Sequence, residues 1–169
     1  DAATIYTAPV TIAALKGFLT PILEETVNFV NAPIIAKERG IEVIEIKSTD
    51  EGDYQSLVAL RLKAKDKVRC FAGTLLSKKD PRLVMIDAFK VEVVPEGELL
   101  FMYNNDKPGV IGNIGTLLGR NKINIARMHF GREAPGGIAI SVVSIDAHAS
   151  DKVIDEIRKL PNILSVKQI

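Results

Sequence analysis

The chain has 169 residues, 47% of them hydrophobic, which suits one domain or two small domains with buried cores. Its 22 basic and 21 acidic residues nearly cancel, so charge favours neither nucleic acid nor a membrane as a partner. The single cysteine, Cys70, excludes an intramolecular disulfide and a multi-cysteine metal site, and the lack of a signal peptide or an apolar run near ~18 residues predicts a cytoplasmic protein without a membrane span.

The first thirty residues are predicted to be helical, because apolar side chains recur there at roughly helical spacing. Pro21 follows Thr20 and precedes two glutamates, so we expect a capped restart of the helix at this point. Asn31-Ala32-Pro33 predicts another helix start, and Gly40 is placed to end that short helix.

From residue 41 the hydrophobic period changes to two, which indicates strands. Four strands are predicted, at residues 58–63, 68–75, 83–86 and 89–94. The first half is therefore predicted to be α+β, with helices followed by a largely antiparallel sheet. Pro95-Glu96-Gly97-Glu98 carries turn chemistry and no apolar residue, so the predicted domains are 1–97 and 98–169.

The second half has a simpler predicted order. It reads as a strand, a helix, two strands, a helix and a strand, at about 99–103, 109–120, 124–131, 138–145, 151–160 and 163–169. This βαββαβ order predicts a ferredoxin-like unit of about 70 residues.

The stretch from Asn104 to Gly112 joins a predicted strand to a predicted helix and is the candidate ligand site. Pro108 sets φ for the first helical turn, where its missing N–H costs nothing. Gly109 and Gly112 allow a ligand or another backbone to approach the helix N-terminus. The free N–H groups there can hold a carboxylate.

Three polar residues are candidates for ligand contacts in this region. We expect Asp106 to face an ammonium group, and Asn104 and Asn124 to bond polar ligand atoms. Asn124 begins the next strand, and we expect it to lie close to the end of the first strand. Ordinary turn and cap chemistry is the alternative, since Asn and Asp favour both settings.

A basic group in the first half is a candidate phosphate or carboxylate site, because guanidinium forks suit such anions. Its members are Lys78, Lys79, Arg82 and Lys90. A solvated turn is the alternative interpretation of the same residues.

No metal site or catalytic group is predicted. His129 and His148 lack the spacing of a metal pair or a nucleophile–base dyad. The four glycines at 109, 112, 115 and 119 fit neither a dinucleotide-binding motif nor a P-loop. Their spacing puts them on one helix face, which favours close packing on the sheet or on a partner chain.

Two sets of residues resemble known domains. Asn105-Asp106-Lys107-Pro108-Gly109-Val110-Ile111-Gly112, with Asn124-Ile125-Ala126, resembles the signature of the ACT domain, a ferredoxin-like module that senses amino acids. The run from Asn31 to Ile41, and Gly73-Thr74-Leu75 with Pro81-Arg82, resemble the intervening domain of long-form D-3-phosphoglycerate dehydrogenases. The turn from Gly131-Arg132 to Gly136-Gly137 is also typical of that group.

The resemblance implies a carboxy-terminal regulatory portion, with an allosteric substrate-binding domain at 1–97 and an ACT domain at 98–169. It also implies L-serine contacts at Asn104, Asp106 and Asn124, with serine bridging two ACT domains that pair edge to edge. Arg82 matches a basic position that can hold a phosphate, whereas Val94 stands where a second basic residue is expected. The family's NAD-linked oxidation of 3-phosphoglycerate belongs to other domains, so this fragment is expected to be inert and to carry no cofactor.

Two alternatives remain open at this point. In the first, the chain is an oligomerisation module without a ligand response, which associates through exposed edge strands. In the second, the same pair of domains is the regulatory chain of a bacterial L-serine dehydratase, although Asn31-Ala32-Pro33 and the run that follows favour the dehydrogenase.

Overall fold

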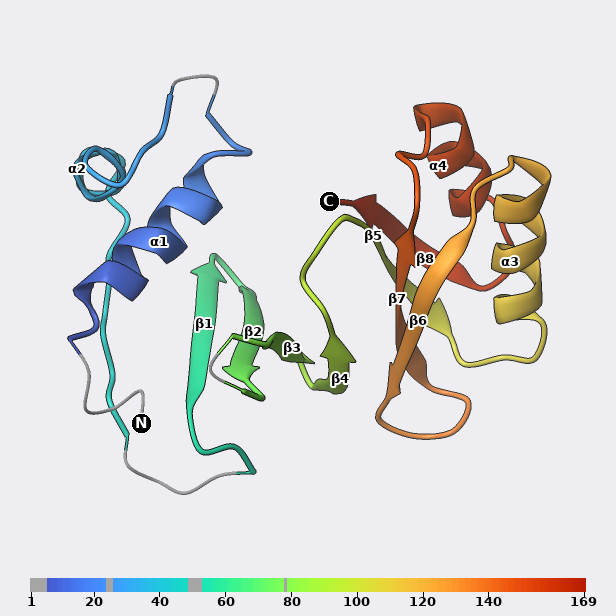
Figure 1. The fold of residues 1–169 in the computed structure, drawn as a ribbon, viewed down its shortest axis with the longest axis horizontal. Coiled ribbons are helices and arrows are strands. Elements are labelled where there is room, and N and C mark those ends of the chain that lie inside the picture. The colour runs from blue at the N-terminus through green and yellow to red at the C-terminus, as the bar shows by residue number, and fades with distance from the viewer. Residues whose placement is uncertain (1–5, 24–25, 49–52, 78) are drawn as a thin grey trace. The chain divides into compact units, whose positions relative to one another are not determined.

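The computed structural model describes residues 6–23, 26–48, 53–77 and 79–169 (Figure 1). These form two compact units, Asp1–Leu60 and Arg61–Ile169. In the described part of the chain, no helix is long and apolar enough to cross a membrane.

The first unit contains helices α1 (Ala8–Leu19) and α2 (Ala32–Glu38). The predicted helix restart at Pro21 is wrong for the residues the structure describes, since no helix lies between α1 and α2 there. Asparagine side chains explain the difference: the Asn28 carboxamide accepts hydrogen bonds from the N–H groups of Val30 and Asn31, at 2.8 and 2.9 Å. Such local turns compete with helical hydrogen bonding.

The predicted end of the second helix at Gly40 is confirmed. Gly40 has φ +68°, its N–H donates to the Lys37 carbonyl, and the Ile41 N–H donates to the Ala36 carbonyl. This is a Schellman motif, in which two otherwise unpaired carbonyls of the last turn are satisfied.

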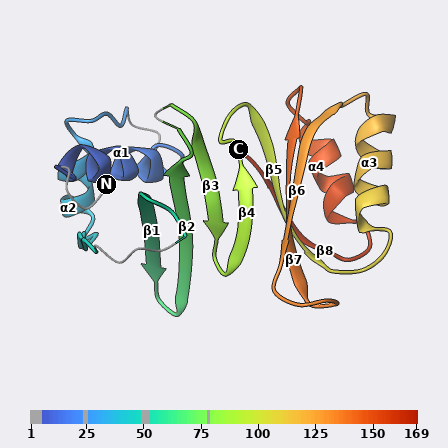
Figure 2. The same cartoon turned by 60° about the horizontal axis from the view of Figure 1, so that its bottom comes forward.

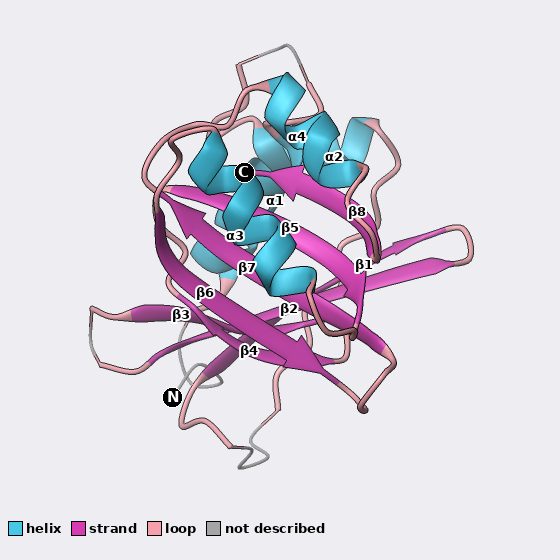
Figure 3. Cartoon of the chain, turned by 90° about the vertical axis from the view of Figure 1, so that its right-hand side faces the viewer, coloured by secondary structure: helices cyan, strands magenta, loops and turns pink. Residues whose placement is uncertain are grey.

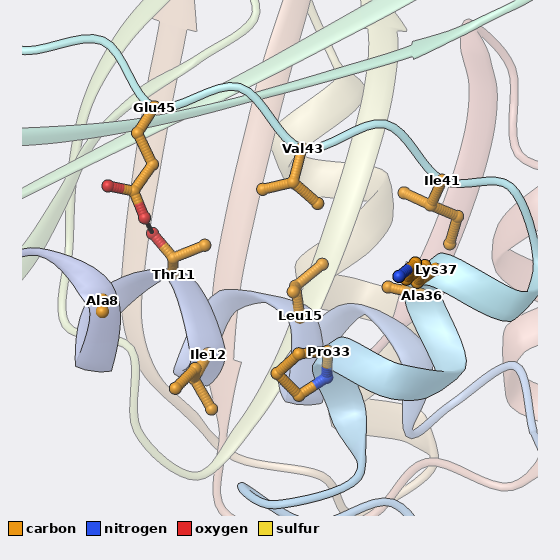
Figure 4. A pocket seen from close by; sticks show the side chains of 10 residues that line it. All are labelled: Ala8, Thr11, Ile12, Leu15, Pro33, Ala36, Lys37, Ile41, Val43 and Glu45. Atoms are coloured by element: carbon orange, nitrogen blue, oxygen red, sulfur yellow. Dashed lines mark hydrogen bonds between the residues drawn. The ribbon is translucent and has the colours of Figure 1, made fainter.

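A cavity of about 320 Å³ lies between α1, α2 and the chain that follows Gly40 (Figure 4). Its lining is mostly apolar, with Leu15 from α1 and Val43 from the following chain among the contributors. Glu45 closes one end by accepting hydrogen bonds from the hydroxyls of Thr7 and Thr11, which hold the pKa of the Glu45 carboxyl below its usual range.

The first sheet contains the four strands that the alternation predicts. They are β1 (Leu57–Ala64), β2 (Lys67–Leu75), β3 (Pro81–Ile86) and β4 (Phe89–Val93). Their order in the sheet is β1-β2-β3-β4, and the β2–β3 and β3–β4 pairs are antiparallel.

The βαββαβ order of the second half is confirmed. Its elements are β5 (Glu98–Asn105), α3 (Val110–Arg120), β6 (Ile125–Arg132), β7 (Ile138–Ile145), α4 (Asp151–Arg158) and β8 (Ile163–Gln168). The sheet order is β6-β7-β5-β8, with α3 and α4 on one face (Figure 3). The predicted α+β class therefore holds.

The two faces of the β5–β8 sheet are covered differently. On one face, buried residues of the sheet and of α3 and α4 form a core that includes Met102, Ile114 and Ile157. On the other face, β3 and β4 pack against β5 and β7 in a second cluster (Figure 2). This cluster contains residues from both sides of residue 97. The assignment of 1–97 and 98–169 as separate functional domains stays a prediction.

Gly131 on β6 is placed where β4 crosses the sheet. A Cβ at this position would lie 2.8 Å from the Lys90 carbonyl oxygen and 3.1 Å from the Phe89 Cβ. The first distance is shorter than real Cβ contacts, and the second is tighter than most of them. Glycine is therefore needed here for close approach of the β4 backbone.

A polar group ties β5 to the first sheet on the same face. The Tyr103 hydroxyl donates to Asp87 Oδ2 at 2.5 Å and accepts from Arg69 Nη2 at 2.8 Å, and the Arg69 guanidinium lies 3.3 Å from the same carboxylate oxygen. Partial burial, with the hydrogen bond to Asp87 as a second cause, raises the pKa of Tyr103 to about 12. Tyr103 immediately precedes the first candidate ligand residue, Asn104.

Candidate ligand site at the end of the central strand

Asn104 is buried near the end of β5, with 3% of its surface exposed. Its Oδ1 accepts a hydrogen bond from the Ser141 hydroxyl at 2.7 Å, and its Nδ2 donates to the Asn105 carbonyl at 3.0 Å. The carboxamide therefore ties β5 to β7 from inside the sheet, and one Nδ2 hydrogen is left for a further acceptor.

Asp106 follows β5, and 29% of its side chain is exposed. Its Oδ2 accepts hydrogen bonds from Arg132 Nη1 at 2.8 Å and from the Gly136 N–H at 3.1 Å. The Asp106 N–H donates to the Gly137 carbonyl at 2.8 Å. These contacts fix the end of β5 against the β6–β7 hairpin.

The electrostatic state of Asp106 follows from those contacts. The Arg132 guanidinium, followed by the Gly136 N–H, lowers the pKa of the Asp106 carboxyl from its usual value. The group is therefore an anion at neutral pH, suited to accept a cation. No described residue hydrogen-bonds to its second oxygen, Oδ1.

The start of α3 differs in detail from the prediction. Gly109 is the N-cap residue with φ +92°, so Pro108 precedes the cap instead of occupying the first turn. A positive φ at the cap explains the glycine. Gly109 has no side chain that could cap this helix, and the leading N–H groups of α3 carry the partial positive charge of a helix N-terminus.

Asn124 lies at the opposite end of the sheet, so the expected proximity to the end of the first strand within one chain is wrong. Ile125 pairs with Ile145, and Ile145 pairs with Glu98 at the start of β5. A crossover helix makes β6 parallel to β5, so the two strands start at the same end, roughly 23 Å from Asp106. There the Asn124 Nδ2 donates to Asp146 Oδ2 at 2.7 Å.

The basic group of the first half does not converge on one point. Arg82 forms an ion pair and hydrogen bond with Asp80, and its Nε lies 3.9 Å from Glu92 Oε1. Lys90 pairs with Met85, three residues along β3 from Arg82, which is roughly 10 Å. Lys79 lies in the preceding turn, and Lys78 falls outside the described residues.

The glycines of α3 do not pack on the sheet, so that part of the prediction is wrong. A Cβ added at Gly112, Gly115 or Gly119 would meet nothing within 4 Å. The buried face of α3 carries Val110, Ile114 and Leu118 instead. The glycine face is open to solvent or to a partner.

Arg132 and Gly136 are the residues of this site that the sequence reasoning missed. The signal was present in the predicted topology. Arg132 pairs with Ala139, and Ala139 pairs with Asn104, so the end of β6 must lie beside the end of β5. Pairing the predicted strands as antiparallel neighbours would have brought the 132–137 turn to Asp106.

Comparison with known families agrees with the fold. Residues 1–87 match the D-3-phosphoglycerate dehydrogenase intervening domain, and residues 99–162 match the ACT domain. The chain belongs to the D-3-phosphoglycerate dehydrogenase intervening-domain family. Its βαββαβ half is an ACT domain, which confirms the resemblance of the sequence to both.

Similar proteins match nearly the whole length of the chain. The D-3-phosphoglycerate dehydrogenase of Bacillus subtilis is 39% identical over 167 residues, covering 99% of this chain and 32% of that protein. The dehydrogenase of the same name from Synechocystis is 41% identical over 155 residues, covering 92% of this chain and 28% of that protein. The one from Methanocaldococcus jannaschii is 39% identical over 157 residues, covering 93% of this chain and 30% of that protein. The chain thus spans about a third of the length of these relatives.

Proposed function

We propose that this chain is the carboxy-terminal regulatory region of a D-3-phosphoglycerate dehydrogenase, the first enzyme of L-serine biosynthesis, and that it binds L-serine for feedback control. The intervening-domain and ACT matches support this, as do relatives of that name. Those names also favour a dehydrogenase parent over an L-serine dehydratase. On this proposal, NAD binding and oxidation of 3-phosphoglycerate belong to the remainder of the parent enzyme.

The serine proposal depends most on the state of the Asp106 carboxylate. Its carboxylate is anionic and partly exposed, and one oxygen is left without a described partner. These are the properties of a group that binds an ammonium ion. The start of α3 supplies N–H groups for the carboxylate of the same ligand, and the spare Nδ2 hydrogen of Asn104 serves a polar ligand atom.

Asn124 joins this site only from a second copy of the chain. β6 is an edge strand of its sheet. If two copies pair antiparallel through β6, the start of one strand lies beside the end of the other. That pairing brings Asn124 of one copy towards Arg132 and Asp106 of its partner copy. The distance between Asp106 and Asn124 within one chain therefore fits a ligand that bridges two protomers.

Bridging gives serine a way to act on the parent enzyme. A ligand that contacts two protomers favours the arrangement in which both halves of its site are assembled, and it shifts that equilibrium only by its differential affinity. A coupling free energy of about 1–3 kcal/mol is typical of such effects. The open glycine face of α3 offers additional surface for contact between copies.

The test is complementation between two variants, Asp106→Ala and Asn124→Ala. Each alone should lose L-serine binding, because each breaks both sites of the dimer. After the two are unfolded and refolded together, a mixed dimer regains one intact site, so binding should return at up to half a site per dimer averaged over the mixture. Asp155→Ala and Asn121→Ala, at exposed positions, serve as matched controls that keep full binding.

An assembly module without a ligand response is the second candidate, and one observation favours it. Asp106 is already engaged by Arg132 and Gly136, as a purely structural residue would be. If the unchanged chain forms dimers that do not bind serine, and the two variants do not bind it separately or mixed, this candidate is supported and the sensor is contradicted.

A further inference from the structure

Asp106 and Arg132 form a pair of opposite charges at the rim of the site. The Arg132 side chain is 57% exposed. Among the described residues, its hydrogen bond and ion pair are with Asp106, and both use Nη1. A guanidinium has five N–H donors, so most of those on Arg132 remain available. Asp106 likewise keeps Oδ1 for another donor.

An α-amino acid has the complementary pair of charges. Its ammonium and carboxylate are attached to one carbon, so the two charges lie only a few ångströms apart. The Asp106–Arg132 pair spans 2.8 Å between its nearest atoms. An amino acid placed alongside can set its ammonium against Asp106 and its carboxylate against Arg132. Charges then alternate in sign around the four groups, and each faces an opposite neighbour.

We propose that Arg132 binds the α-carboxylate of the ligand and so makes the site selective for zwitterionic amino acids over amines that lack a carboxylate. The inference rests on the proposed function, in which Asp106 receives the ammonium. It adds a charged donor to the backbone N–H groups of α3, and a guanidinium fork matches the two oxygens of a carboxylate.

A competing role for Arg132 predicts different behaviour. If it only neutralises Asp106, any ammonium ligand must overcome its repulsion, and removing it should strengthen binding of amines and amino acids alike. If it only fixes the β6–β7 hairpin, removing it should weaken binding of both. Only a carboxylate contact makes the effect depend on the carboxylate of the ligand.

The experiment compares L-serine with L-serinamide, which keeps the ammonium and the hydroxyl but has a neutral amide in place of the carboxylate. Binding is followed by the backbone amide resonances of Gly136 and Gly137 in the full 169-residue chain, which reports weak affinities as well. The variants are Arg132→Gln and Arg132→Lys. Arg158→Gln, which removes the same charge from a similarly exposed side chain in helix α4, is the matched control.

We expect Arg132→Gln to weaken L-serine binding by about ten- to a hundredfold, the effect of losing hydrogen bonds between charged partners. L-Serinamide should bind to Arg132→Gln no more weakly than to the unchanged chain. Arg132→Lys should recover part of the serine affinity, and Arg158→Gln should change the affinity for neither ligand. The inference is overturned if Arg132→Gln keeps or strengthens serine binding, or weakens both ligands equally. In those cases loss of serine binding in Asp106→Ala still leaves the proposed function standing. Failure of the unchanged chain to bind serine refutes both.

Discussion

Tyr103→Phe isolates one hydroxyl group in the contact between β5 and the first sheet. Phenylalanine keeps the aromatic ring, and with it the edge-to-face contact with Phe89 at 6.0 Å and the position of Arg69 over the ring. The substitution removes only the hydrogen bonds to Asp87 and Arg69. The Asp87 side chain, which is 22% exposed, loses a donor that water replaces incompletely.

The magnitude follows from the charges of these partners. Hydrogen bonds to charged groups contribute about 1.5–3 kcal/mol when they are buried, and partial exposure of Arg69 and Asp87 places this pair at or below the low end, about 1–2 kcal/mol. For a chain of this length, that loss lowers Tm by roughly 2–8 °C. Urea and thermal unfolding measure it, with Tyr6→Phe, whose side chain is exposed, as the control.

The pH dependence has a definite sign. The pKa of Tyr103 is raised from 10.0 to about 12 in the folded chain, so folding favours the neutral phenol. This stabilisation is fully present below about pH 10 and is lost as the pH rises through about 12. Tyr103→Phe should therefore lose less stability than the unchanged chain between these values. If the two chains are equally stable at neutral pH and their stability falls equally with pH above 10, the Tyr103 hydroxyl does not stabilise this contact.

Three further predictions concern packing and charge. Gly131→Ala should destabilise the fold by about 1–3 kcal/mol, because a Cβ there meets the Lys90 backbone. Gly17→Ala, in helix α1, should stabilise the fold by about 0.5–1 kcal/mol, because the added Cβ meets nothing within 4 Å. Urea unfolding of both variants measures these changes. The Gly136 amide resonance should report a pKa of Asp106 that is lowered from the ordinary aspartate value by Arg132, so the hairpin contact should persist to a lower pH than an unperturbed aspartate would allow. In Arg132→Gln the same titration should move to higher pH. Asp80→Asn should increase affinity for inorganic phosphate by releasing Arg82, measured by calorimetry, and no change would show that Arg82 is not an anion site.

Sequence periodicity predicted the ACT half well because local and tertiary signals agree there. α3 carries its buried residues at helical spacing, and β5 and β7 are apolar runs bounded by turn residues. The prediction for the region after α1 failed because the two kinds of signal disagree there. Its apolar spacing is helical, but Asn28 and Asn31 form local turns that periodicity does not register.

The candidate site was predicted in part. Asp106 follows from the turn chemistry of its own segment, and the structure places it at an accessible strand end. Arg132 is 26 residues away in the sequence, and only the β5–β7–β6 register makes the two neighbours. The position of Asn124 was wrong for the same reason, because strand direction decides which end of the sheet a residue occupies.

Calorimetric titration of the 169-residue chain with L-serine, at a concentration where the chain is dimeric, tests whether the chain is a serine sensor. We expect saturable binding of L-serine, weaker binding of glycine and D-serine, and no binding of L-serine to Asp106→Ala. A flat titration of the dimeric chain would contradict the serine-sensor proposal. So would a result in which the unchanged chain and Asp106→Ala bind L-serine and D-serine with the same affinity.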